Sequence, residues 1–222
     1  MAERPPGRYA TPQGLEGQWQ PGSRGRVPRN LLGIRSRRQI DRAEYEALVA
    51  VQAAYLERVT SRTRFTARLL RQMHADWLGG IYEWAGQYRH VELSKGGFQW
   101  PPAFRVAENM EAFERGVLAK RTPCSASPLP VVARGIAEVH AELLLIHPFR
   151  EGNDRLARWL ADLMALQAGL PLPQYRFSGR GGKARQAAYL RAVKAGYAQD
   201  YELLTGFFRD AIDRRLREEA DD

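Results

Sequence analysis

Residues 147–158 bring together side chains that could act on a phosphate-containing substrate. The segment holds a titratable base, carboxylates, a Gly-Asn turn and arginines, in the order His147, Pro148, Phe149, Arg150, Glu151, Gly152, Asn153, Asp154, Arg155, Leu156, Ala157 and Arg158. Proline disfavours helical geometry in the residue before it. We therefore expect Pro148 to end a helix and to leave His147 at the edge of a loop, where its imidazole could accept a proton.

The second half of this segment has the composition of an anion-binding turn. Gly152 and Asn153 can direct successive backbone N–H groups toward one point, and the start of a following helix adds the positive end of its dipole. Arg155 and Arg158 are three residues apart, so they should be neighbours on one helix face, where their guanidinium groups can bind phosphate oxygens. The pattern predicts a site for a di- or triphosphate.

Glu151 fits the same hypothesis, because Mg²⁺ that arrives with a nucleotide is usually held by one or two carboxylates together with phosphates and water. Positioning and charge stabilisation supply most of the catalysis in phosphoryl-type transfer. Each residue alone has a more ordinary explanation: a histidine beside proline is often structural, and an arginine pair on a helix is usually a solvated face. Their joint occurrence favours catalysis.

The elements that must position this segment are helical. Apolar spacing predicts helices over residues 39–59, 65–82, 104–118, 131–146, 154–167 and 185–216, the last interrupted near Gly196 and Gly206. Two short runs on either side of Lys95-Gly96-Gly97 predict a β-hairpin. We therefore expect an all-α domain with one small hairpin.

The first 30 residues have a different character. They are rich in proline, glycine and arginine and lack an apolar period, so we predict a flexible basic arm over 1–30 and a helical domain over 31–222. Six of the nine excess positive charges lie within residues 1–42. A nearly balanced domain behind a basic arm disfavours a dedicated nucleic-acid groove, although the arm could contact RNA or an acidic partner.

Composition excludes several other classes of protein. No run approaches the ~20 apolar residues that span a bilayer, and no secretory signal opens the chain. The single cysteine, Cys124, can form no internal disulfide and has no neighbouring Cys or His at the spacing of a metal site. We expect a cytoplasmic protein that does not contact a membrane, with Cys124 as an ordinary core or loop thiol.

Residues 147–158 resemble the signature of the Fic family, His-x-Phe-x-Asp/Glu-Gly-Asn-Gly-Arg-x-x-Arg, and match every specified position except Asp154, where the family has Gly. Upstream, His74 and residues 81–89 resemble the family's stretch before its hairpin flap, and Lys95-Gly96-Gly97-Phe98 resembles the flap. The resemblance extends over about residues 30–208.

This resemblance implies an all-helical Fic-type fold with a hairpin flap, and an enzyme that transfers AMP from ATP to a Tyr, Ser or Thr hydroxyl of a protein substrate. His147 would deprotonate that hydroxyl, and Glu151 would hold Mg²⁺ or Mn²⁺. Phe149 would pack inward. The flap would hold the target segment by strand addition. The residues implied in nucleotide binding are Gly152, Asn153, Asp154, Arg155 and Arg158.

Two departures from the family pattern leave alternatives open. Asp154 brings a negative charge toward the anion site, whereas relatives of the Doc branch carry Lys there and act as kinases. AMP transfer, transfer of phosphate or another nucleotide, and a catalytically weakened interaction module all remain hypotheses. The family's inhibitory Ser/Thr-x-x-x-Glu-Gly/Asn run is not found in the sequence. Inhibition would then come from a separate small antitoxin, as in a toxin-antitoxin pair, or be absent.

Overall fold

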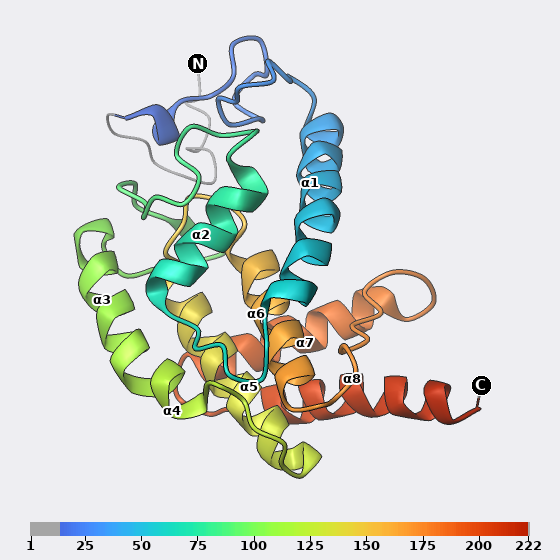
Figure 1. Ribbon diagram of the computed structural model, residues 1–222. Coiled ribbons are helices and arrows are strands. Elements are labelled where there is room, and N and C mark those ends of the chain that lie inside the picture. Colours follow the sequence, from blue (N-terminus) through green and yellow to red (C-terminus); the bar gives the residue numbers. More distant parts are fainter. Residues whose placement is uncertain (1–13, 222) are drawn as a thin grey trace. The chain divides into compact units, whose positions relative to one another are not determined.

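The computed structural model describes residues 14–221 (Figure 1). Its elements confirm an all-α fold with one small hairpin. In chain order they are η1 (Leu15–Gly17), α1 (Arg37–Arg58), α2 (Ala67–Leu78), β1 (Ser94–Lys95), β2 (Phe98–Gln99), η2 (Ala103–Arg105), α3 (Val106–Phe113), the π-helical turn η3 (Glu114–Leu118), α4 (Ala119–Arg121), α5 (Leu129–Ile146), α6 (Asn153–Gln167), α7 (Gly182–Gly196) and α8 (Glu202–Asp221).

The described residues form two compact units. Unit 1 comprises residues 14–55, Ala67–Glu111 and Ile146–Leu156, and unit 2 comprises Leu56–Thr66, Ala112–Leu145 and the chain from Ala157. The boundary predicted near Asn30 does not divide the units, since residues on both sides of it belong to unit 1. Helix α6 begins in unit 1 and continues in unit 2.

Unit 1 is organised around α1 and α2, which lie side by side (Figure 1). The indole Nε1 of Trp77 donates to the backbone oxygen of Glu44 at 2.8 Å, and the Tyr55 hydroxyl donates to Asp76 at 2.8 Å. The buried apolar side chains of α2 are Ala67, Leu70, Met73, Trp77 and Leu78, which form the one-sided stripe expected of an amphipathic helix.

Apolar spacing over residues 39–59 had put Tyr45, Val49 and Leu56 at helical intervals with Ile40 and Leu48. Tyr45, Val49 and Leu56 are exposed, whereas Glu44 is only 3% exposed. The buried positions of α1 are Ile40, Glu44, Leu48 and Tyr55. A carboxylate therefore occupies the middle of the packed face, and its partners lie in other parts of unit 1.

The predicted flexible arm lies partly outside the described residues, namely over 1–13. Residues 14–30 pack against the rest of unit 1: Trp19 and Pro28 form an isolated antiparallel bridge, and Val27 is 0% exposed. The backbone oxygen of Glu16 accepts from Nε of Arg150 at 2.9 Å, and its carboxylate accepts from the backbone N–H of His90. Proline and glycine content and the lack of an apolar period had suggested disorder, but Glu16, Ser23 and Val27 of this segment are buried.

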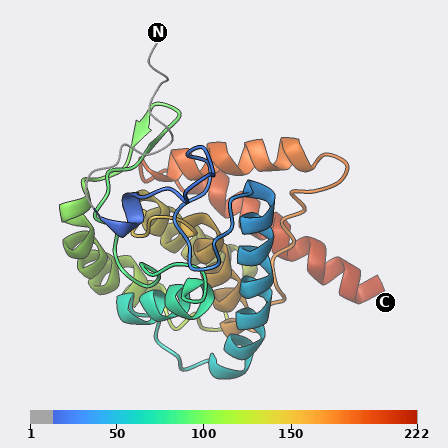
Figure 2. The same cartoon turned by 90° about the horizontal axis from the view of Figure 1, so that it is seen from above.

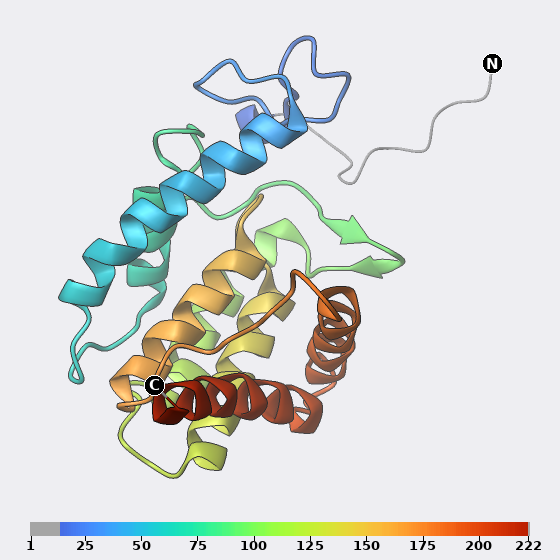
Figure 3. The same ribbon diagram turned by 90° about the vertical axis from the view of Figure 1, so that its right-hand side faces the viewer.

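The predicted hairpin is present in unit 1. Strands β1 and β2 pair antiparallel, with Ser94 opposite Gln99 and Lys95 opposite Phe98. Gly96 and Gly97 form the turn with φ of 57° and 80°, the left-handed region that glycine enters without cost. The hairpin projects outward (Figures 2 and 3).

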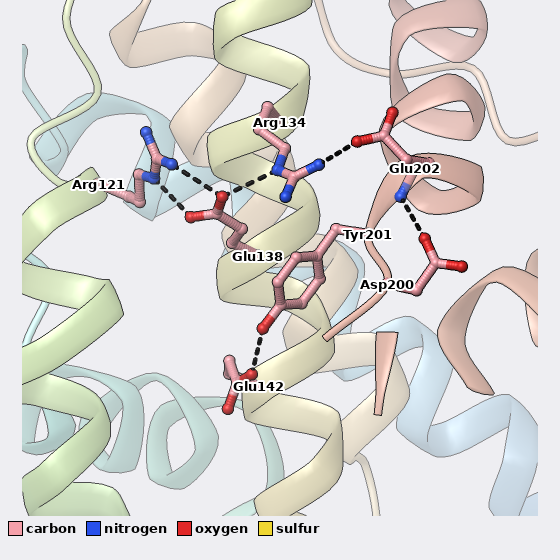
Figure 4. Close-up of polar contacts among 7 residues, drawn as sticks. All are labelled: Arg121, Arg134, Glu138, Glu142, Asp200, Tyr201 and Glu202. Atoms are coloured by element: carbon pink, nitrogen blue, oxygen red, sulfur yellow. Dashed lines mark hydrogen bonds and ion pairs between the residues drawn. The ribbon is translucent and has the colours of Figure 1, made fainter. Parts of the chain in front are cut away.

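Unit 2 packs α7 against α8 (Figure 3). A charged cluster joins α4, α5 and α8 in the same unit (Figure 4). Glu138 of α5 accepts hydrogen bonds from Arg121 at 2.7 and 2.8 Å and from Arg134 at 2.9 Å, and Arg134 also pairs with Glu202. Gly196 ends α7 as predicted, whereas Gly206 lies inside α8 and does not interrupt it.

Cys124 is buried in unit 2 at 7% exposure, and its backbone N–H donates to the side chain of Gln167 at 3.1 Å. Burial raises the pKa of its thiol. Gln167 also donates to the backbone oxygens of Thr60 and Thr63, both at 2.8 Å. No helix among the described residues combines the length and the apolarity needed to cross a bilayer.

Candidate active site

The segment predicted to carry chemistry is a loop between α5 and α6. Helix α5 ends at Ile146, directly before His147 and Pro148, as the proline predicted. His147 has a φ of 52°, a conformation that few residues other than glycine adopt, and its side chain is half-buried. Its ring stacks on the indole of Trp100, which follows β2, with centroids 4.0 Å apart. The imidazole therefore lies at the edge of the loop beside the hairpin.

Arg89 holds the start of the loop. Its guanidinium donates to the backbone oxygens of His147 at 2.8 Å, Val91 at 3.0 Å and Pro101 at 2.6 Å, and its own backbone N–H donates to the oxygen of Pro148 at 2.9 Å. Because Val91 precedes the hairpin and Pro101 follows it, one buried side chain connects both ends of the hairpin segment to the loop. The position of His147 relative to the hairpin is thereby fixed.

Asn153 locks the middle of the loop. Its Oδ1 accepts from the backbone N–H of Phe149 at 2.9 Å, and its Nδ2 donates to the backbone oxygen of Phe149 at 2.6 Å. Both polar atoms of the side chain are therefore engaged inside the loop, and the residue is only 3% exposed. The structure places the Asn153 side chain in a positioning role, so any contact of this residue with phosphate would use its backbone N–H.

Phe149 packs inward, as predicted, with 0% exposure. Its ring stacks on the imidazole of His74 from α2, with centroids 3.9 Å apart and planes 12° from parallel. The Nε2 atom of His74 also lies 3.1 Å from the backbone oxygen of Glu151. Helix α2 thus contacts the loop at two points.

Gly152 marks the sharpest part of the turn. Its φ is +83°, and a Cβ atom there would lie 2.8 Å from the ring of Trp77. Its oxygen accepts from the N–H of Leu156 at 2.9 Å, so Gly152 precedes the first turn of α6. The first N–H groups of a helix have no acceptor within that helix, and they give its N-terminus an affinity for anions.

Arg155 of α6 is held by a carboxylate that sequence reasoning did not connect with it. Its Nη2 lies 2.6 Å from Oε2 of Glu44, whose Oε1 accepts from the hydroxyl of Tyr82 at 2.5 Å. The guanidinium also lies 4.7 Å from the ring centre of Trp77. Arg155 remains 27% exposed in its side chain.

The residues present fit a nucleotide-bound Mg²⁺. Among the described residues, no group of three or more His, Cys, Asp or Glu side chains could hold a metal. Glu151 is 13% exposed in its side chain, and its Oε1 lies 3.7 Å from Nη1 of Arg150. A single carboxylate beside a helix N-terminus suits an ion that takes its other oxygens from phosphate and water.

The other predicted residues lie as follows. Asp154 is exposed in the first turn of α6, where its charge favours the helix dipole. Arg158 belongs to unit 2, where its guanidinium lies 5.6 Å from the ring centre of Phe177 and 6.0 Å from that of Tyr189.

At the hairpin, Lys95, Gly96 and Gly97 are exposed, and Phe98 is half-buried with its ring against Trp100.

Sequence reasoning did not connect four supporting residues with the loop: Glu44, Trp77, Tyr82 and Arg89. A signal existed for Glu44, because a carboxylate four residues after Ile40 and four before Leu48 falls on an apolar helix face. Nothing in the spacing indicated Arg89, whose acceptors are backbone oxygens distributed over two segments.

Known proteins match the part of the chain that contains this loop. A model of the Fic/DOC family matches residues 64–165. The chain is 26% identical over 140 residues to the protein adenylyltransferase VbhT of Bartonella schoenbuchensis, a match covering 63% of this chain and 29% of that protein. It is 32% identical over 147 residues to the probable protein adenylyltransferase y4lH of Sinorhizobium fredii, covering 64% of this chain and 70% of that protein.

The fold is also similar to that of solved structures. The crystal structure of the BepC protein of Bartonella tribocorum with bound AMPPNP aligns with a TM-score of 0.67 at 18% identity, covering 83% of this chain and 91% of that chain. The likeness in fold, the family match across the loop and the identity to y4lH agree. This chain belongs to the Fic/DOC family.

Proposed function

We propose that this protein transfers AMP from ATP to a hydroxyl group of a target protein, a post-translational modification called AMPylation. The observation that carries the proposal is the loop of residues 147–155, held so that the His147 imidazole lies at its edge beside the hairpin while Gly152 and Asn153 open the N-terminus of α6. A proton acceptor and an anion-binding turn within one short loop are what phosphoryl-type transfer requires.

In the proposed reaction, the target's hydroxyl oxygen attacks the α-phosphorus of ATP. The bond between that phosphorus and the oxygen bridging to the β-phosphate breaks, pyrophosphate leaves, and the hydroxyl proton passes to His147. The N-terminal N–H groups of α6 and the guanidinium of Arg155 would stabilise the phosphate charge. Arg158 is proposed as a further phosphate ligand. Mg²⁺ or Mn²⁺, held at Glu151, would neutralise phosphate charge when bound.

The hairpin is proposed as the surface that holds the target segment. An exposed two-stranded hairpin offers backbone N–H and C=O groups to which an extended segment can add as a further strand. Because Trp100 stacks on His147 directly after β2, a segment bound along Lys95–Phe98 would be delivered to the imidazole.

The direct test is incubation of host extracts and of the protein itself with α-labelled ATP and Mg²⁺ or Mn²⁺. Protein labelling is expected with the parent and should disappear with His147→Ala. His90→Ala is the matched control, because its side chain is 80% exposed and it lies in the same unit. Absence of His147-dependent labelling on any protein would exclude AMP transfer.

Asp154 favours a second candidate, because it adds a negative charge to the first turn of α6, where the family signature has Gly. Label from γ-labelled ATP in place of α-labelled ATP would identify a phosphotransferase. If neither label transfers, calorimetry with AMPPNP and Mg²⁺ separates the remaining choices: binding gained by Asp154→Gly but absent in the parent identifies a weakened interaction module.

A toxin role and a small antitoxin-type inhibitor belong to the same proposal. Expression of the parent should arrest growth of the host, and His147→Ala should restore growth. Normal growth with the active parent would exclude the toxin role without affecting the enzymatic proposal.

A further inference from the structure

We propose that His74 is a positioning residue that sets the direction of the Gly152 backbone N–H, and thereby builds the anion-binding turn. The inference rests on the proposed function for its consequence, but its structural part concerns only α2, Gly86 and the loop within unit 1. His74 is 0% exposed, so its imidazole is proposed to act on a bound nucleotide only through the residues that it contacts.

The hydrogen bonds of His74 determine its tautomer. The backbone N–H of Gly86 donates to Nδ1 at 2.8 Å, so Nδ1 must carry a lone pair. A neutral imidazole then has its proton on Nε2, which donates to the backbone oxygen of Glu151 at 3.1 Å. Burial lowers the pKa of His74 to about 4, in keeping with a ring that stays neutral.

This bond fixes a peptide plane. In a planar trans peptide the C=O group and the following N–H group point in opposite directions. With the Glu151 oxygen directed inward to the buried His74, the N–H of Gly152 must point to the other side of the loop, away from α2. That N–H immediately precedes the N–H groups of the first turn of α6, so a phosphate there would meet them together.

Two further observations indicate that His74, and not the loop alone, sets the orientation of the Glu151–Gly152 peptide plane. Gly152 has a positive φ, a region in which glycine can rotate its peptide planes with little penalty. Without a donor at position 74, the Glu151 oxygen would lose its partner and the peptide could turn. The stacking of His74 on Phe149 fixes the ring that makes the bond.

The test compares His74→Phe, which keeps a ring against Phe149 but has no donor, with His74→Gln, whose Nε2 can replace the donor. The readout is the dissociation constant of AMPPNP with Mg²⁺, measured by calorimetry. We expect about tenfold weaker binding for His74→Phe, because the Gly152 N–H would no longer donate a charge-assisted hydrogen bond to the phosphate. Binding by His74→Gln should stay close to that of the parent.

Gln167→Leu serves as the control for stability. It removes another buried side chain that joins separate backbone segments, all of them in unit 2. It should lower the melting temperature as His74→Phe does while leaving AMPPNP binding unchanged. Equal binding by the parent and His74→Phe, or equal loss in His74→Phe and His74→Gln, would overturn the inference.

A second readout needs no nucleotide. In protein labelled with ¹⁵N-histidine, the His74 signal at neutral pH should be that of the Nε2–H tautomer, as the two hydrogen bonds of the ring require. An Nδ1–H tautomer would overturn the inference even if AMPPNP binds. If AMPPNP fails to bind the parent, the proposed function fails, while the predicted tautomer supports the structural assignment independently.

Discussion

Two separate features of its position favour glycine at residue 152, and experiment can distinguish them. Its φ of +83° strains any residue with a Cβ, and a Cβ at this position would also lie 2.8 Å from Trp77. Gly169 has a similar φ of +75° with no atom within 4 Å of a Cβ. The two glycines therefore differ in the close contact and share the backbone strain.

We predict that Gly152→Ala costs clearly more stability than Gly169→Ala. Strain alone should cost about 1–2 kcal/mol in both variants, and the collision with Trp77 adds to it only at position 152. Urea denaturation measures the difference. Labelling with α-labelled ATP should be lost only in Gly152→Ala, and equal stabilities would show that the loop moves away from Trp77 freely.

Glu44 and Glu46 allow a similar comparison on one helix. Glu44 is buried between Arg155 and Tyr82, whereas Glu46 pairs with Arg42 in an exposed i,i+4 contact. Removing one partner of a buried pair leaves the other charge uncompensated, which typically costs ~3 kcal/mol or more. Exposed pairs contribute ~0.5 kcal/mol.

Accordingly, Glu44→Gln should lower the free energy of unfolding by about 2–4 kcal/mol, and Glu46→Gln by less than about 0.5 kcal/mol. Thermal or urea denaturation would check both. A small effect of Glu44→Gln would mean that Arg155 finds another anion in unit 1.

The sequence predicted chemistry for residues of the loop but did not predict which side chains support that loop. His147, Glu151 and Gly152 are recognisable because residue type and spacing limit what each can do. Asn153 was assigned to phosphate, yet its amide is used to lock Phe149, since an amide can satisfy a loop as readily as a ligand. Arg89 could not be found, because a guanidinium that binds backbone oxygens leaves no pattern in neighbouring residues.

At the scale of elements, apolar periodicity predicted where the helices lie, but it did not predict which face of α1 is buried. Periodicity treats every glutamate as exposed, so it could not anticipate that Tyr82 and Arg155 make burial of Glu44 tolerable. The interruption predicted near Gly206 is also absent from α8. The packing of this helix in unit 2 offsets the low helix propensity of glycine.

The cluster around Glu138 connects three helices of unit 2 and gives a pH-dependent prediction. Burial opposes ionisation of Glu138, but hydrogen bonds from Arg121 and Arg134 outweigh it and hold its pKa below the ordinary value (Figure 4). A carboxylate with a lowered pKa contributes stability that is present above its ordinary pKa and is lost as the pH falls through the folded value.

We therefore expect Glu138→Gln to be less stable than the parent at pH 7, with a difference that shrinks as the pH is lowered below about 4.5. Denaturant titrations at several pH values measure this difference. The exposed Glu202, which also pairs with Arg134, provides the control, and Glu202→Gln should change little. A difference that does not depend on pH would assign the effect of Glu138 to packing.

For the whole molecule, a single helical domain after residue 30 stays a prediction. The described residues form two compact units whose boundaries cut through α1, α3, α5 and α6. Sequence patterns mark the ends of helices and not the groups into which helices pack. Residues 14–30 belong to unit 1 through Glu16 and Val27.

Truncation tests that assignment. A chain that begins at residue 31 should melt several degrees below one that begins at residue 14, because it loses the burial of Val27 and leaves Arg150 without the Glu16 oxygen. Differential scanning calorimetry of both chains measures the change. Identical melting temperatures would place residues 14–30 outside the cooperative unit.

The buried state of Cys124 has a practical consequence. The chain's one native thiol is hidden and reluctant to ionise, so it should be nearly inert toward maleimides at neutral pH. A cysteine introduced at the exposed Lys95 would then be the sole attachment point for a fluorophore, without engineering a cysteine-free background. Docking of a client polypeptide on the hairpin could be followed in real time by the emission of that dye.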